Sequence, residues 1–231
     1  MTTLPDIPMI HDERGFLAVA KPSGVATIPG RGIPMGESVR ERLEVQLGVS
    51  LLPVHRLDRG TSGVLLFARD AATHRTLNGL FESRRVSKRY LAGVVGIPPS
   101  DVGRRERPLV MDKGERVQET FAGGPGISAS TEWRVVSIGM ALPAWGLPDA
   151  EVALLDVRPT TGRRHQIRVH LSSMGCPILG DPLYAHDPVR IAWPRLCLHA
   201  SAIQFPHPST GKPIEIRVST PSDLPMFMQS T

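Results

Sequence analysis

The stretch that most constrains the fold of this chain is His55 to Ala68, which reads HRLDRGTSGVLLFA. Its second half, Val64 to Ala68, is short, wholly apolar and preceded by turn-forming residues, which predicts a buried β-strand. Its first half places Asp58 on a loop just before that strand, where scaffolds usually hold reactive groups. A loop Asp can also cap a turn or pair with a neighbour such as Arg56 or Arg59. Asp58 is therefore a candidate functional residue with two structural alternatives.

The rest of the pattern predicts a single mixed α/β domain over residues 10–225. Apolar spacing and capping residues predict helices at 37–47, 70–81 and 163–174. Breaker-bounded apolar runs predict strands at 16–20, 64–68, 91–96, 131–138, 151–157, 198–205 and 214–218. The segment 100–114 is polar and rich in Arg, and we expect an exposed excursion there. The expected architecture is a largely antiparallel central sheet flanked by helices, with Arg164 and Arg168 together on the last helix.

The charge balance suggests a polyanionic partner without establishing one. Lys and Arg together number 27 against 22 Asp and Glu, a formal net charge of +5. Nearly all the basic residues are arginines, because the lysines are confined to positions 21, 88, 113 and 212. Arginine forks onto phosphates and stacks on bases, which suits RNA or DNA. A solvated basic surface, or a genome whose codons favour Arg, explains the same count.

The chain shows no sign of a membrane or secretory protein. No apolar run approaches the roughly 20 residues of a membrane span, and the first ten residues lack a basic segment followed by an apolar one. We therefore expect a cytoplasmic location. The cysteines, Cys176 and Cys197, follow no metal-binding spacing, and we expect two reduced, structural thiols.

Several blocks, in this order, resemble the RluA-type RNA pseudouridine synthases. They are Lys21 to Gly24 (KPSG), His55 to Ala68, Lys88 to Tyr90 (KRY) and Thr161 to Ala185 (TGRRHQIRVHLSSMGCPILGDPLYA), followed by a closing strand from Leu198. The resemblance implies the pseudouridine synthase fold and an isomerase that acts on RNA. Longer members carry a small RNA-binding domain ahead of the catalytic one, and we expect no such domain in this chain.

The resemblance also assigns three catalytic roles. It implies that Asp58 is the nucleophile, that Arg168 pairs with Asp58 and keeps it ionised, and that Tyr90 stacks on uracil and serves as a base or proton relay. Addition of Asp58 to the sugar and a glycal route both fit the residues. As alternatives, Arg168 can pair with a surface acid and Tyr90 can be a core residue.

Substrate contacts follow from the same resemblance. The target uridine has to flip out of the RNA, and Arg56 matches the residue that fills the vacated space; a salt bridge is its alternative role. His55, next to Arg56, is also predicted to lie among the substrate-binding residues. The predicted phosphate contacts, or else a solvated basic edge, are Arg84, Arg85, Lys88, Arg89, Arg163 and Arg164. For His55, His165 and His170 we expect structural hydrogen bonds and no metal site.

The sequence therefore predicts an RNA uridine isomerase, with ribosomal or transfer RNA as the partner. We expect no cofactor, no metal, no DNA or membrane partner, and a monomer. Two other functions remain as alternatives. One is a catalytically silent RNA-binding or ribosome-assembly factor on the same fold, and the other is a nucleoside hydrolase that would release free uracil.

Overall fold

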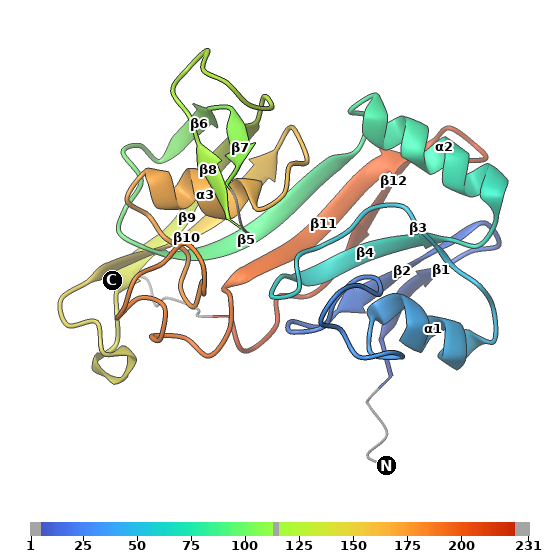
Figure 1. Cartoon of the computed structure of the whole chain (residues 1–231), viewed down its shortest axis with the longest axis horizontal. Coiled ribbons are helices and arrows are strands. Elements are labelled where there is room, and N and C mark those ends of the chain that lie inside the picture. Colours follow the sequence, from blue (N-terminus) through green and yellow to red (C-terminus); the bar gives the residue numbers. More distant parts are fainter. Residues whose placement is uncertain (1–5, 113–115, 225–231) are drawn as a thin grey trace. The chain divides into compact units, whose positions relative to one another are not determined.

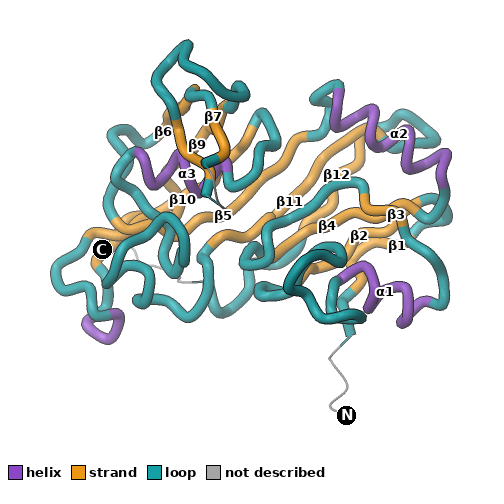
Figure 2. Tube along the Cα trace, in the orientation of Figure 1, coloured by secondary structure: helices purple, strands orange, loops and turns teal. Residues whose placement is uncertain are grey.

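The computed structural model describes residues 6–112 and 116–224, which form two compact units (Figure 1). The first unit comprises residues 6–87 and 200–219, and the second comprises 88–112, 116–199 and 220–224. Each unit has an antiparallel sheet and its own apolar core, and helices are few (Figure 2). The predicted fold class, an α/β protein with a largely antiparallel sheet, is confirmed. The limits of a single domain over 10–225 stay a prediction.

The first unit is built on the strand predicted at 64–68. This strand, β4 (Ser62–Ala68), pairs antiparallel with β2 (Phe16–Lys21), which pairs with β1 (Met9–Asp12). The short β3 (Leu52–Pro53) also pairs with β4, and β11 (Leu198–Pro206) pairs with β12 (Pro213–Arg217). Every residue of β4 is buried, so both faces of the strand are covered, as its unbroken apolar run predicts.

In the first unit the predicted stop of one helix, Gly48, and the predicted N-cap of the next, Asp70, are confirmed. Helix α1 (Val39–Leu47) starts with a capping box between Ser38 and Glu41 and stops at Gly48, whose φ of 68° suits the left-handed region. Helix α2 (Ala71–Glu82) is capped by Asp70, whose carboxylate accepts a hydrogen bond from the Thr73 amide. Its buried Leu77 and Leu80 pack in one core with residues of β2 and β4.

In the second unit, β5 (Ser87–Val95) pairs with β10 (Glu151–Pro159), β10 with β9 (Ser130–Met140), and β9 with β6 (Val102–Glu106), all antiparallel. A hairpin of β7 (Leu109–Met111) and β8 (Val117–Glu119) stands beside them. Helix α3 (Gln166–Ser173) packs against β9 and β10, and η1 (Pro143–Trp145) is a short 3₁₀ turn.

The prediction of an exposed excursion over 100–114 is confirmed in part. The side chains of β6 are exposed or half-exposed, but β6 and β7 are paired strands of the second unit and not an excursion from it. On β6 the apolar signal is hidden: Gly103 has no side chain, and the ring of Trp133 occupies the space where a Cβ would be. On β7, Leu109 is buried with Val117 and Val169 in a small core. Gly114, the end of the predicted segment, lies outside the described residues.

Helix α3 corrects a second prediction, since it begins at Gln166 and not at residue 163. His165 has a left-handed φ of 54°, which an ongoing helix does not allow. The Gln166 side chain also accepts hydrogen bonds from the Arg163 amide and from Thr161, and so fixes the turn before the helix. Arg164 therefore lies outside the helix and is exposed, whereas Arg168 is buried, so the two do not share a face.

Both cysteines are buried and free, and burial raises the pKa of both thiols, as expected for structural residues. Among the described residues, no helix has the length and apolar character that crossing a membrane requires.

Candidate active site

The loop that carries Asp58 is bonded on one side of Asp58 to Thr27 and on the other side to the KPSG turn. Thr27 Oγ1 accepts from the Leu57 amide at 3.1 Å and donates to the Leu57 carbonyl at 2.9 Å. On the other side, the Gly24 amide donates to the Arg59 carbonyl at 2.9 Å, and Ser23 donates to the Gly60 carbonyl at 2.7 Å. The half-buried Asp58 thus sits on a backbone held rigidly at both ends, as a reactive group requires.

Beneath this loop lies Lys21, whose side chain is 1% exposed. Its ammonium donates to the carbonyls of Pro22, Val25 and Arg59, at 2.8, 2.6 and 3.1 Å. Burial lowers the pKa of Lys21 to about 7, against an opposing attraction to Asp58 that raises it. An amine that titrates near neutral pH therefore lies close to the candidate nucleophile. The KPSG block pointed to this turn, but not to a charge buried under it.

His55 and Arg56 precede Asp58 and differ in their surroundings. His55 Nε2 accepts a hydrogen bond from the Leu66 amide at 3.1 Å, and its ring stacks on that of Phe81, with the ring centroids 5.1 Å apart. Arg56 is exposed, and within residues 6–112 and 116–224 no ion pair involves it. Among the described residues, Arg56 therefore does not form the salt bridge that was its alternative role.

On β5 the block Lys88 to Tyr90 is split by strand alternation. Lys88 and the half-buried Tyr90 share one face, and Arg89 points to the other. Lys88 donates to the Thr161 carbonyl at 3.1 Å, and burial lowers its pKa to about 8. Arg89 forms a two-point pair with Asp156, at 3.2 and 2.7 Å. Both basic groups have partners within the second unit.

The remaining predicted phosphate contacts are exposed. Arg84 and Arg85 lie in the turn after α2, in the first unit, and Arg163 and Arg164 lie in the turn before α3, in the second. Arg163 donates from Nε to the Ser128 carbonyl at 3.1 Å. The predicted basic surface is therefore made of two exposed pairs, each on a different unit.

Arg168 is held by an acid that the sequence analysis did not single out. Its Nε and Nη2 donate to the two carboxylate oxygens of Asp181, at 2.8 and 2.7 Å. The Arg168 side chain is 5% exposed and that of Asp181 is 0% exposed. Asp58 belongs to the first unit and Arg168 to the second, so the Asp58–Arg168 pair stays a prediction. Asp181 belongs to the sequence GDPLY, in which Gly and Pro predict a turn. Nothing in this sequence predicts that the acid pairs with Arg168.

The three histidines make the structural hydrogen bonds expected of them. His165 Nδ1 bonds Tyr184 Oη at 2.8 Å. His170 bonds Thr131 Oγ1 at 2.9 Å and the Arg107 carbonyl at 3.2 Å. Among the described residues, no group of three or more His, Cys, Asp or Glu side chains is arranged to hold a metal ion.

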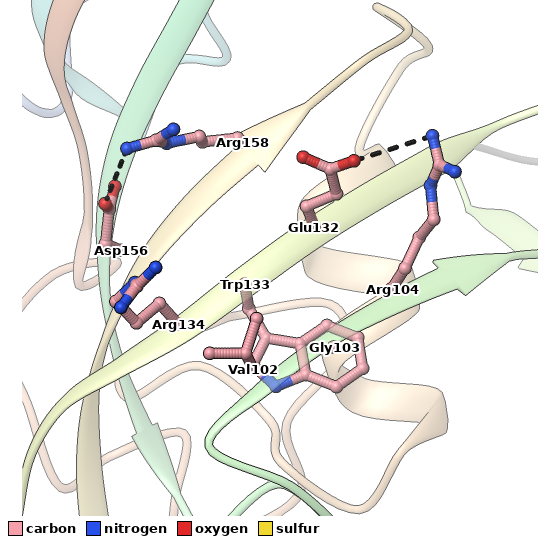
Figure 3. Close-up of a pocket in the computed structure, with 8 residues that line it drawn as sticks. All are labelled: Val102, Gly103, Arg104, Glu132, Trp133, Arg134, Asp156 and Arg158. Atoms are coloured by element: carbon pink, nitrogen blue, oxygen red, sulfur yellow. Dashed lines mark ion pairs between the residues drawn. The ribbon is translucent and has the colours of Figure 1, made fainter.

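A separate groove of about 320 Å³ lies on β6, β9 and β10 (Figure 3). It is lined by Val102, Gly103, Arg104, Glu132, Trp133, Arg134, Asp156 and Arg158. Its charges offset one another, since Arg104 lies 3.5 Å from Glu132 and Arg158 lies 3.5 Å from Asp156. The groove faces the same side of the sheet as Arg89, away from Tyr90, so it does not belong to the candidate site.

Comparison with known proteins identifies the family of this chain. The family model described as RNA pseudouridylate synthase matches residues 15–173. The dual-specificity RNA pseudouridine synthase RluA of Yersinia pestis is 35% identical over 209 residues, covering 90% of this chain and 97% of its own. The RluA of Escherichia coli K12 is 35% identical over 207 residues, 90% of either chain.

A solved structure gives the same result. Human RNA Pseudouridylate Synthase Domain Containing 1 superposes with a TM-score of 0.78 at 25% identity, covering 94% of this chain and 84% of its own. The order of the blocks, the antiparallel fold and these likenesses agree. The chain belongs to the RNA pseudouridylate synthase family and is an isomerase that acts on RNA.

Proposed function

We propose that this enzyme isomerises specific uridines in ribosomal or transfer RNA, with Asp58 as the nucleophile. The observation that carries the proposal is the Asp58 loop, where the half-buried Asp58 sits on a backbone bonded at both ends and close to the buried amine of Lys21, whose pKa is about 7. The relatives named dual-specificity RNA pseudouridine synthases support testing two classes of RNA.

In the proposed reaction, the bond between uracil N1 and ribose C1′ breaks and a bond between C5 and C1′ forms. The Asp58 carboxylate adds to C1′ or assists a glycal intermediate, as carboxylates do beside developing sugar cations. The detached uracil turns in the pocket, C5 attacks C1′, the C5 proton leaves and N1 gains a proton. Because product and substrate are isomers, no water, metal or cofactor is consumed, and we propose that none takes part.

Tyr90 and Arg168 complete the proposed site. Tyr90 stacks on the uracil, and its hydroxyl takes or relays the C5 proton. Arg168 holds Asp58 in the ionised form through charge-assisted hydrogen bonds. The burial of Arg168 supports this role, because a guanidinium shielded from water interacts more strongly with a carboxylate than an exposed one does.

The target uridine reaches this site by flipping out of the RNA, at a cost of a few kcal/mol. We propose that Arg56 occupies the vacated space, where its planar group stacks and donates hydrogen bonds. Its exposure and the absence of an ion pair to the described residues support this role, since nothing has to be broken before it inserts. His55 fixes the backbone beside Arg56 through its bond to Leu66.

Phosphate contacts are proposed for the exposed arginines at 84, 85, 163 and 164. Lys88 and Arg89 are already bonded to Thr161 and Asp156. We therefore propose that they contribute positive charge near the RNA without binding a phosphate directly. We further propose a cytoplasmic monomer that ignores DNA, which carries thymine in place of uracil, and membranes. Sedimentation, cell fractionation and competition with DNA of the same sequence test these points.

The test of the substrate is to map pseudouridines in ribosomal and transfer RNA from a deletion strain. Specific sites should lose the modification and regain it with the wild-type gene, but not with Asp58→Asn. Purified enzyme should act on transcripts containing the same sites and release no free uracil. Complete modification of both RNA classes in the deletion strain would overturn the substrate assignment, and free uracil would point to a hydrolase.

A further inference from the structure

The groove on β6, β9 and β10 brings three arginines together on the outer face of the second unit's sheet (Figure 3). The strand register explains how they meet. Arg134 of β9 lies opposite Asp156 of β10. Glu132, two residues earlier on β9, lies opposite Arg158 of β10 and opposite Arg104 of β6. Residues opposite one another on paired strands point from the same face, so these five side chains line one surface.

The ion pairs in this groove do not cancel its positive charge. The side chain of Asp156 is 9% exposed and already accepts a two-point fork from Arg89, at 3.2 and 2.7 Å. Arg158 lies 3.5 Å from the same carboxylate. Arg134 faces Asp156 across the strands and forms no ion pair with the residues that the structure describes. Three guanidiniums therefore lie around one carboxylate, and positive charge is in excess.

Arg134 and Arg158 also keep their hydrogen-bond donors available. Neither side chain donates a hydrogen bond to another residue within 6–112 and 116–224, and the 3.5 Å contact of Arg158 is longer than a strong hydrogen bond. Both side chains are exposed. A guanidinium carries five N–H donors, in a geometry that matches the oxygens of a phosphate. An anion can therefore bind both arginines without breaking a hydrogen bond in the described part of the chain.

Arg104 gives a comparison within the same groove. Its side chain is 51% exposed and that of Arg158 is 52% exposed, so access to solvent does not distinguish them. Arg104, however, lies 3.1 Å from Glu106 and 3.5 Å from Glu132. Two acids thus offset its charge. The excess positive charge of the groove is concentrated at Arg134 and Arg158.

The spacing of these two arginines suits a single phosphate. Arg158 follows Asp156 by two residues, so Arg134 and Arg158 are diagonal neighbours on paired strands. Such neighbours lie about 7–8 Å apart, and two side chains as long as arginine converge on one group across that distance. Val102, opposite Arg134 on β6, is exposed and gives the groove an apolar wall. Paired guanidiniums beside an apolar wall fit a sugar–phosphate unit.

We propose that this groove is an RNA-binding site separate from the candidate active site, in which Arg134 and Arg158 together hold one phosphate of an RNA strand. The chain belongs to a family of enzymes that act on RNA, so RNA is the polyanion that charge complementarity favours. A contact of this kind positions the RNA without reading its sequence. The inference does not depend on the proposed catalytic roles, because the groove contains none of the residues that carry them.

Filter binding of the intact chain to bulk transfer RNA and to large ribosomal RNA tests this site. Arg134→Gln and Arg158→Gln break no hydrogen bond in the described part of the chain, so both variants should fold, as circular dichroism verifies. Each should raise Kd for at least one of the two RNAs by about three- to ten-fold at about 0.15 M salt. The double variant should reduce the slope of log Kd against log salt by about 0.7–0.9, the contribution of one phosphate. With saturating RNA, kcat should stay within about two-fold of wild type.

Two further variants separate the groove from a general loss of positive charge. Arg190→Gln removes the same charge from an exposed arginine that pairs with Asp187, also in the second unit, and should leave Kd within about two-fold of wild type. Glu132→Gln removes a negative charge from the rim of the groove and should lower Kd by about two- to five-fold. A purely structural role of the ion pairs does not predict tighter binding.

Wild-type Kd and salt slope in the folded double variant, with both RNAs, would overturn the inference. Binding of uridine monophosphate alone that disappears in the double variant, while RNA affinity is unchanged, would overturn it too, because the groove would then serve a free nucleotide. A slope reduced by twice the expected amount would contradict the sharing of one phosphate by Arg134 and Arg158. Loss of catalysis in these variants at unchanged Kd would likewise contradict a role confined to RNA binding.

Discussion

The Asp58 loop and the Arg168 helix hold charged groups by opposite means. Around Asp58 the backbone is fixed, by hydrogen bonds from Thr27, Ser23 and Gly24, and the residue is half-buried. Around Arg168 the side chain is fixed, by the Asp181 fork and the Tyr184 ring, in a buried position. A rigid backbone suits a group that must meet a substrate, and a rigid guanidinium suits a group that acts by direction.

The largest effect should come from Asp58→Asn, which keeps the shape of the side chain and removes its charge. We expect turnover to fall roughly 10⁴-fold or more, as for other nucleophiles, because the amide can neither add to C1′ nor stabilise a sugar cation. RNA binding, measured by filter retention, should stay within a few-fold. Turnover within ten-fold of wild type would show that Asp58 is not the nucleophile.

Arg168→Lys tests whether the fixed orientation of the Arg168 guanidinium matters for catalysis. Lysine keeps a charge but cannot make the two-point fork to Asp181, so we expect kcat to fall about 10²-fold with little change in KM. Arg190→Lys is the control, since it alters an exposed fork. If Arg168→Lys retains full activity, the charge suffices and orientation by the fork is unimportant.

The two regions also differ in how far the sequence predicted them. The Asp58 loop was predictable because its determinants are local: a breaker-rich turn, then an apolar run that can only be a buried strand. The Arg168 region was harder, because helix α3 begins where His165 adopts a left-handed φ, and no propensity rule signals that in advance. Asp181 gave no local sign of its role, since its partner lies 13 residues earlier in the chain.

Lys21 shows the same limit within the better-predicted region. Lys-Pro-Ser-Gly reads as a turn, and a turn lysine is ordinarily exposed. Only the folded unit, with three carbonyls converging on the ammonium, makes burial tolerable. Long-range satisfaction of a polar group of this kind cannot be obtained from spacing along the chain.

Lys21→Met sharpens the comparison through pH. The unfolded chain keeps the Lys21 proton up to its usual pKa of 10.5, whereas the folded unit loses it near 7. Between these values the unfolded state binds more protons, so the free energy of unfolding should rise with pH, by up to about 1.4 kcal/mol per unit. Urea unfolding at pH 7 and 9 measures this.

In the Lys21→Met variant the rise of the free energy of unfolding with pH should lack the contribution of Lys21, because Met does not titrate. Lys212→Met, which alters an exposed lysine, should reproduce the wild-type slope. Equal slopes for wild type and Lys21→Met would mean that Lys21 keeps its proton when folded. Asp58→Asn should lower the pKa of Lys21 further, because the Asp58 charge is what opposes the effect of burial.

The smallest effect concerns how each unit holds the RNA. If Arg84 and Arg164 each neutralise one phosphate, Arg84→Gln and Arg164→Gln should each reduce the slope of log Kd against log salt by about 0.7–0.9. The two changes should add in the double variant, because each residue lies on its own unit. Arg190→Gln, on an exposed arginine already paired with Asp187, serves as the control. A slope that changes only with Arg84→Gln would assign the phosphate contacts to the unit that carries Asp58.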